Sequence, residues 1–150
     1  MTNLDSINKS ILRELQRDGR ISNSDLADKV GLSPSACLRR VQELERNDVI
    51  TGYRAIINPQ AMGVGLIAFI TVGLSEHQKK DQKAFEKAMA RAPEVRECHN
   101  VTGSFEYILR VEVSDLNAFK VFHTEVLGVV PEVKNISSYI CMESPKDERG

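Results

Sequence analysis

A cluster of arginines after Ser33 has the residue types and spacing of a binding surface for a negatively charged ligand. Ser33-Pro34 is typical of a helix start, because a serine hydroxyl accepts an orphan backbone N–H and a proline at the first helical position has none to lose. In the predicted helix one apolar stripe faces inward, formed by Cys37, Val41 and Leu44 with Leu38 beside it. The opposite side is basic and rich in small residues: Ser35, Arg39, Gln42 and Arg46, flanked by Ala36 and Glu43, with Arg40 nearer the apolar edge.

Small and basic residues at the start of a helix suit binding to double-stranded DNA, because arginine can contact both base edges and phosphates. We expect base contacts from Ser35, Ala36 and Arg39. We expect phosphate contacts from the amides near Ser33 and from the side chains of Arg40, Arg46 and Arg54. In a different interpretation the arginines lie on a solvated face and pair with Glu43 and Glu45. The glycine turn before the helix favours DNA binding.

Two further helices are predicted to position the arginine-bearing one. Asp5 can cap a first helix that ends at Asp18-Gly19, and its apolar residues share one stripe. Asn23 or Ser24 can cap a second helix, which Gly31 closes. Helices joined by so short a glycine turn pack at a steep angle, which is the geometry of a helix-turn-helix.

A change in the hydrophobic pattern predicts two domains. Two strands, Val49–Ile50 and Tyr53–Ile57, are expected to form a wing after the helices. Asn58-Pro59 and two nearby glycines then interrupt the chain. We therefore expect a winged helix-turn-helix domain with a linker strand over residues 1–60 and a second domain over residues 61–150.

Alternating and β-branched runs dominate the second domain. They predict an α+β fold of the split β-α-β-β-α-β, or ferredoxin-like, type. The expected elements are a strand at Leu66–Leu74, a helix at Asp81–Arg91, strands at Val95–Val101 and Tyr107–Val113, a helix at Asp115–Leu127 and a strand at Val133–Met142.

The first of these strands is apolar on both faces. Leu66, Ala68, Ile70 and Val72 alternate with Ile67, Phe69 and Thr71. Helices can cover only one face of such a sheet, so an apolar second face predicts that another subunit covers it. We expect an obligate homodimer.

Composition limits the function classes. The net charge of -1 excludes a uniformly basic surface, so DNA binding requires a local patch. The longest apolar run, Val64–Val72, is too short to span a bilayer, and the N-terminus lacks the apolar core of a signal peptide. A cytoplasmic protein without membrane attachment is expected. The three cysteines are widely spaced, so we expect them to be reduced thiols. Cys98 and His99 are adjacent on a strand and point to opposite faces, so they cannot bind one metal together. We expect His99, His77 and His123 to be structural or surface residues, and we expect no metal site.

Motifs along nearly the whole chain resemble those of the leucine-responsive/AsnC (Lrp/AsnC), or feast/famine, transcriptional regulators. They are LDxxxxxIL from Leu4, DGRIS from Asp18, LSPSACLRRVQELE from Leu32, IxGY from Ile50, ECHNVTGSFEYIL from Glu97 and SYICME from Ser138. The resemblance implies a winged helix on DNA, a βαββαβ ligand domain, and dimers that assemble further, commonly into octamers. It also implies regulation by an amino acid, leucine or another, with no other cofactor.

The resemblance also implies where the effector binds. The family's hairpin, typically G-x-F/Y-D-Y, lies where dimers meet, and it corresponds here to Gly103, Ser104 and Glu106. Glu106 replaces the usual aspartate and is one methylene longer, so the pocket or the effector differs. Further positions that match the family's effector response are Asn100, Leu116, Tyr139, Ile140 and Cys141. Core packing is the alternative role for Leu116, Tyr139 and Ile140.

Two other functions compete with an amino-acid-responsive regulator. One is an architectural protein that wraps DNA by oligomeric multivalency and has no small ligand. The other is an enzyme, since some haem-precursor decarboxylases resemble this family. The capped, arginine-bearing helix at Ser33–Arg46 argues against the enzyme, and no catalytic residue is predicted.

Overall fold

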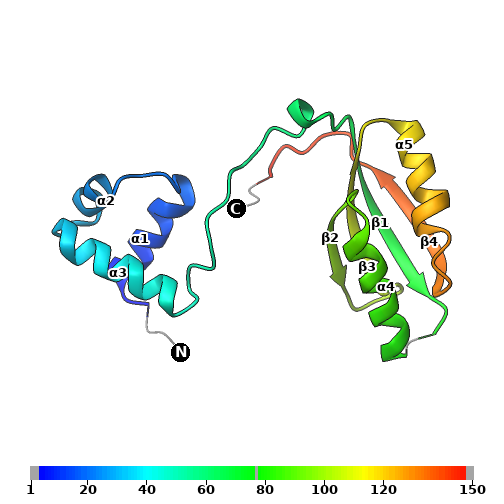
Figure 1. Cartoon of the computed structure of the whole chain (residues 1–150), viewed down its shortest axis with the longest axis horizontal. Coiled ribbons are helices and arrows are strands. Elements are labelled where there is room, and N and C mark those ends of the chain that lie inside the picture. The colour runs from blue at the N-terminus through cyan, green and yellow to red at the C-terminus, as the bar shows by residue number, and fades with distance from the viewer. Residues whose placement is uncertain (1–3, 77, 148–150) are drawn as a thin grey trace. The chain divides into compact units, whose positions relative to one another are not determined.

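The computed structural model describes residues 4–76 and 78–147. The backbone divides into two units, one that ends at Ile56 and one that spans Ile57–Asp147 (Figure 1). Each unit has its own hydrophobic core. No helix in the described ranges is long and apolar enough to cross a membrane.

The first unit contains three helices: α1 (Ser6–Arg17), α2 (Asn23–Val30) and α3 (Pro34–Arg46). Each begins at a side-chain cap, as the N-cap oxygen accepts a backbone N–H three residues later. Asp5 caps α1 and Ser33 caps α3, as predicted. The predicted cap of α2, Asn23 or Ser24, was wrong, because the Ser22 hydroxyl accepts the Asp25 N–H at 3.0 Å and the helix begins at Asn23.

The turn between α2 and α3 depends on Gly31. Its φ of 70° lies in the left-handed region that a glycine adopts without steric cost. The three helices enclose a small core of Ile11, Leu26, Ala27, Cys37 and Leu44. The predicted stripe on α3 is confirmed for Cys37 and Leu44, whereas Leu38 is 47% exposed.

The predicted wing strands were wrong. Between α3 and the first strand, the only regular element among the described residues is a short 3-10 turn, η1 (Gln60–Met62). The N–H groups of Val49 and Ile50 both bond to the Leu44 carbonyl, at 2.9 and 3.1 Å, so they close α3. Tyr53–Ile57 is extended but pairs with no described strand, and the Tyr53 hydroxyl donates to Glu45 at 2.9 Å.

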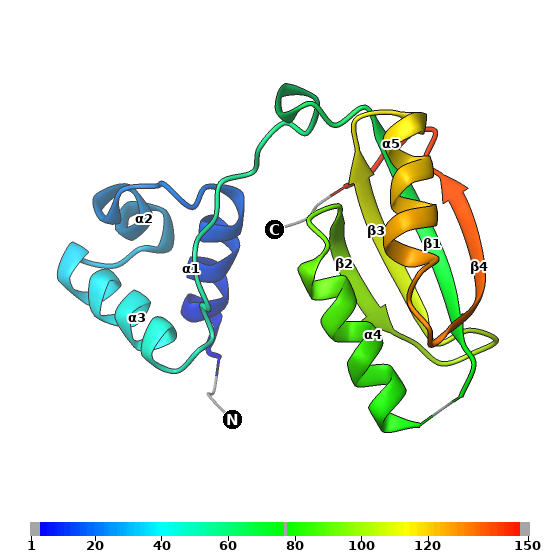
Figure 2. The same cartoon turned by 45° about the vertical axis from the view of Figure 1, so that its right-hand side comes forward.

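The second unit confirms the β-α-β-β-α-β fold. Its elements are β1 (Leu66–Leu74), α4 (Lys79–Arg91), β2 (Val95–Asn100), β3 (Tyr107–Val113), α5 (Leu116–Val121), which continues into a π-helical segment η2 (Phe122–Leu127), and β4 (Val133–Ile140). The strands form one antiparallel sheet in the order β2-β3-β1-β4. Helix α4 and the continuous helix formed by α5 and η2 cover the same face of that sheet (Figure 2).

The covered face of the sheet forms the core. Ala68, Ile70 and Val72 of β1 are fully buried there, as the alternation of the strand predicted. They pack with Phe85 of α4 and Phe122 of η2. Ile67, Phe69 and Thr71 lie on the opposite face, which we call the open face because no described helix covers it.

Candidate functional site

The outer side of α3 carries the predicted base-contacting residues. Ser35 and Arg39 are exposed, and Ala36 is half-buried beside them. Arg46 is exposed at the last position of the helix. Within the described part of the chain, neither Arg39 nor Arg46 forms an ion pair, so the predicted alternative of pairing with Glu43 or Glu45 does not describe this structure. Two guanidinium groups are therefore available to a ligand on this side.

Polar contacts hold α3 in place against the other two helices. The Asn23 amide of α2 donates to the Pro34 carbonyl at 2.8 Å, next to the start of α3. Lys29 of α2 pairs with Glu14 of α1 at 2.9 Å. The Ser33 hydroxyl accepts the Ala36 N–H at 3.3 Å and lies 3.3 Å from the Ser35 hydroxyl. The contacts of Asn23 and Ser33 fix the first turn of α3, where bases and phosphates would be met, and the Lys29–Glu14 pair joins α2 to α1.

Arg40 differs from its neighbour Arg39. Its guanidinium donates to Asp5 at 2.7 Å and to Asn8 at 2.9 Å, so the structure ties it to the start of α1. The Asn8 N–H and then the Arg40 guanidinium hold the pKa of Asp5 below its usual value. Arg54, the other predicted phosphate contact, is exposed on the extended segment after α3.

The hairpin between β2 and β3 contains the predicted effector-binding motif. The Val101 N–H donates to the Glu106 carbonyl at 2.9 Å and closes the turn. Gly103 has a φ of 132°, a conformation that side-chain-bearing residues rarely adopt, and nothing lies within 4 Å of where a Cβ would be. Gly103 and Ser104 are both exposed. The hairpin therefore presents its backbone to solvent.

Glu106 leaves the hairpin tip and contacts β1. Its N–H donates to the Val72 carbonyl at 3.0 Å, and its Oε2 accepts the Leu74 N–H at 2.7 Å. A Cβ added to Gly73 would lie 3.7 Å from this Oε2 and 3.5 Å from the Asn135 Cβ. The carboxylate and Asn135 thus approach each other over a glycine of β1.

Asn100 lies on the other face of the sheet, directly opposite Tyr107 in the β2–β3 ladder. Its side chain hydrogen-bonds to Tyr107, whose hydroxyl donates to Glu86 of α4 at 2.8 Å. Burial, reinforced by Glu86, raises the pKa of Tyr107 to about 12. These groups line a cavity of about 290 Å³ between α4 and β2. Sequence reasoning missed the Tyr107–Glu86 bond, because no local pattern relates residues 21 positions apart.

Cys98 lines the same cavity. Burial is the main cause that raises the pKa of its thiol to about 11. The thiol is therefore protonated at neutral pH and is a poor nucleophile. No group of three or more potential metal ligands occurs within residues 4–76 and 78–147, and His77 lies outside the described residues.

The remaining predicted effector residues are distributed over the edge strand and α5. Leu116 lines a cavity of about 660 Å³ between α5 and β4, together with Phe119, Lys120 and His123. Tyr139 pairs with Phe69 on the open face, and Ile140 pairs with Ala68 on the helix-covered face. Cys141 follows β4, with its Sγ 3.4 Å from the Ser144 Oγ.

A single copy of the chain thus does not bring the predicted effector residues into one cavity. Gly103, Ser104 and Glu106 are close together, whereas Asn100, Leu116 and Tyr139 lie in three other places.

Comparison with known proteins agrees with this division of the chain. Residues 4–51 match the winged helix-turn-helix DNA-binding family, and residues 67–150 match the Lrp/AsnC ligand binding domain. The leucine-responsive regulatory proteins of Klebsiella pneumoniae and Escherichia coli (strain K12) are each 41% identical to this chain over 143 residues. That alignment covers 95% of this chain and 87% of each relative.

Solved structures extend the likeness to the whole fold. A transcriptional regulator from Neisseria meningitidis, in complex with L-Met, has a TM-score of 0.92 and 34% identity, covering 97% of this chain and 94% of that one. The feast or famine regulatory protein from M. tuberculosis, complexed with L-methionine, has a TM-score of 0.85 and 34% identity, covering 98% of this chain and 97% of that one. With a DNA-binding helical unit joined to an Lrp/AsnC ligand-binding unit, the chain belongs to the Lrp/AsnC family of transcriptional regulators.

Proposed function

We propose that this regulator binds operator DNA through the exposed side of α3 and that an amino acid, bound near the hairpin, changes that binding. The observation that carries the DNA-binding part is the pair of exposed, unpaired guanidinium groups of Arg39 and Arg46 on a helix fixed by its neighbours. Ser35, Ala36 and Arg39 contact bases in the major groove. Phosphates are bound by Arg46, Arg54 and the amides near Ser33. Arg40, which was also predicted to contact phosphate, is held by Asp5 and Asn8 and has a mainly structural role.

Two adjacent arginines should respond differently to replacement by alanine. Arg39→Ala should weaken operator binding by about 1–3 kcal/mol and leave random-sequence binding almost unchanged, because base contacts carry specificity. Arg40→Ala should mainly lower the melting temperature, because it releases Asp5 and Asn8. Titration of both DNA types and thermal unfolding measure the two effects.

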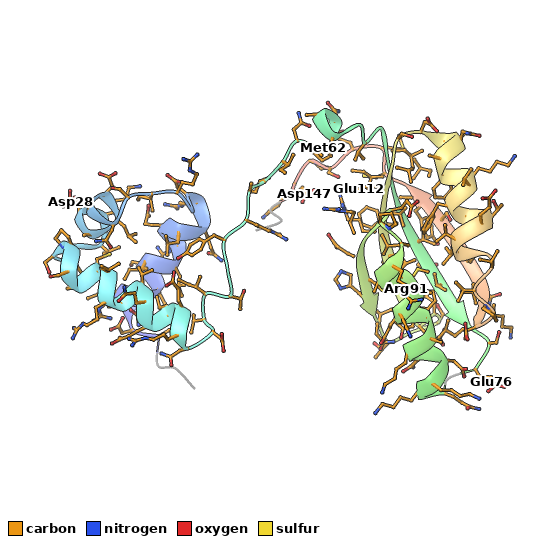
Figure 3. All side chains as sticks on the ribbon, viewed as in Figure 1. Asp28, Met62, Glu76, Arg91, Glu112 and Asp147 are labelled. Carbon is orange, nitrogen blue, oxygen red and sulfur yellow. The ribbon has the colours of Figure 1, made fainter. Side chains whose placement is uncertain are left out.

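The matched control is Arg91→Ala, which removes the same charge at the end of α4 in the other unit (Figure 3). An equal loss of affinity for operator and random DNA in Arg39→Ala would make Arg39 a phosphate contact only.

The amino-acid part of the proposal rests on the hairpin and the relatives. Backbone amides at Gly103 can approach a carboxylate because no side chain shields them. The relatives named above are leucine-responsive or bind L-methionine, so we propose an effector with an apolar side chain of that size. The site includes Gly103, Ser104 and Glu106, with Asn100, Leu116, Tyr139, Ile140 and Cys141 contributing from the same copy or a neighbouring one.

A second copy of the chain is the proposed cover of the open face. Phe69 is 39% exposed there and Tyr139 beside it is 59% exposed. Arg110 of β3 is only 4% exposed on this face and is paired with Glu112 at 2.5 Å (Glu112 is labelled in Figure 3). Exposed aromatic side chains beside a neutralised charge suit an isologous dimer interface. We propose further assembly of these dimers, up to an octamer, through apolar residues left on the outside of α5.

A thermal-shift panel of the twenty amino acids tests the effector proposal. A ligand that binds only the folded protein must raise its melting temperature. One class of amino acid should do so for the wild type and not for Gly103→Val, because a β-branched residue does not adopt the φ found at position 103. Gly19→Ala is the control, since its added Cβ would make only ordinary contacts in the other unit.

If no amino acid shifts the wild-type transition, the effector proposal is wrong. A DNA-wrapping protein without a small ligand would then replace it.

A further inference from the structure

Glu106 is attached to β1 by two different groups. Its backbone N–H donates to the Val72 carbonyl, and its side-chain Oε2 accepts the Leu74 N–H. In an antiparallel ladder, residues two apart on one strand point their polar groups toward the same neighbour. The backbone polar groups of Val72 and Leu74 therefore both point toward β3, and Glu106 hydrogen-bonds to both residues.

The side chain is needed because β3 ends too early to satisfy Leu74. The β1–β3 ladder ends at the Val72–Tyr107 pair, and the chain then turns away into the hairpin. On the other side of β1, the register with β4 shifts between Gly73 and Leu74. Leu74 is buried, at 4% exposure. A buried N–H without a partner destabilises a fold, so the Glu106 carboxylate replaces the backbone carbonyl of β3 that would otherwise accept the Leu74 N–H.

We propose that Glu106 is a positioning residue, which fastens the hairpin to β1 through the Leu74 N–H and so sets the shape of the effector site. Its link to regulation rests on the proposed function of the hairpin, whereas the contact with Leu74 does not. The role depends on side-chain length and on an acceptor oxygen, and it does not depend on the negative charge.

Two conservative substitutions separate this role from direct binding of an ammonium group. Glu106→Gln keeps the length and an acceptor oxygen but removes the charge. Glu106→Asp keeps the charge but shortens the side chain by one carbon–carbon bond, about 1.5 Å. The carboxylate would then fall short of an N–H that it now meets at 2.7 Å. If Glu106 fastens the hairpin, Glu106→Gln should retain the bond to the Leu74 N–H and Glu106→Asp should lose it. If Glu106 binds the effector's ammonium group, Glu106→Asp should retain binding and Glu106→Gln should lose it.

Two measurements on the full-length protein test the proposal. Hydrogen exchange of the Leu74 amide reports the fastening without any ligand. We expect exchange in Glu106→Asp to be about tenfold faster than in the wild type and in Glu106→Gln to be nearly unchanged, the factor being that of one hydrogen bond. The thermal-shift panel reports the effector, and we expect its response to survive in Glu106→Gln and to fall in Glu106→Asp. Glu125→Gln, at an exposed position of η2, controls for the lost charge.

The outcomes keep the two proposals apart. Faster exchange in Glu106→Asp alone supports the fastening role, even if no amino acid affects any variant, a result that would reject only the effector proposal. Unchanged exchange in Glu106→Asp overturns the fastening role. A thermal response that survives in Glu106→Asp and is lost in Glu106→Gln also overturns it and makes Glu106 a direct ligand of the effector.

Discussion

Replacement of Phe69 by aspartate should convert the proposed dimer into a folded monomer. In an isologous dimer the change occurs twice, once on each side of the interface. Burial of a phenylalanine side chain contributes about 2–3 kcal/mol, so the pair of substitutions should weaken dimerisation by about 4–6 kcal/mol, or roughly 700-fold to 20,000-fold. Desolvation of two carboxylates adds to this loss. Sedimentation at micromolar concentration measures the result.

The fold of the single chain should tolerate this change. Arg110 lies directly opposite position 69 in the β1–β3 ladder and can pair with a carboxylate there. Circular dichroism should therefore show an unchanged helix and strand content. Met62→Asp in η1 is the control, because Met62 is also an exposed apolar side chain, at 69%, but lies neither on the sheet nor on α5. A dimer that persists in Phe69→Asp would show that another surface joins the copies.

Dissociation should also reduce DNA binding. Each copy offers one α3, and two linked copies bind with an avidity that neither has alone. The monomeric variant should thus bind operator DNA more weakly, although none of its DNA-contacting residues has changed.

The sequence predicted most of the fold, because local signals determine most of its elements. Periodic apolar residues located β1 and β3 at their observed bounds. Cap residues located the starts of α1 and α3. The wing strands could not be predicted correctly in the same way, because a strand also needs a partner, and Tyr53–Ile57 finds none in the described chain.

Contacts between distant residues account for what sequence reasoning could not provide at the candidate sites. The helical position of Arg40 was predicted near the apolar edge, yet nothing local indicated that Asp5 would hold it. The hairpin was located from its motif, whereas the bond from Glu106 to Leu74 depends on where β3 ends relative to β1. Asn100 and Tyr139 are on opposite faces of the sheet because of strand pairing, which a motif does not show.

The separate cores of the two units have a functional consequence. The helical unit relies on Ile11, Leu26, Ala27, Cys37 and Leu44, and none of these belongs to the core of the ligand-binding unit. Stability of a unit with about 50 residues is only about 3–7 kcal/mol. One large cavity in its core can therefore unfold it while the other unit remains folded.

Leu44→Ala should for this reason abolish DNA binding and preserve the response to the effector. Leu44 is 1% exposed, and truncation of a buried leucine costs about 2–5 kcal/mol, most of the stability of the helical unit. Its carbonyl also accepts the N–H groups of Val49 and Ile50, so loss of packing there releases the end of α3. Calorimetry should show an early transition for the helical unit and an unchanged transition for the ligand-binding unit.

Leu38→Ala is the control for this experiment, since it makes the same truncation on the same helix at a position that is 47% exposed. It should shift neither transition by much, because an exposed leucine leaves no cavity when it is shortened. A single transition that falls as a whole in Leu44→Ala would mean that the two units unfold together. We expect two transitions, because each unit has a separate hydrophobic core formed by its own residues.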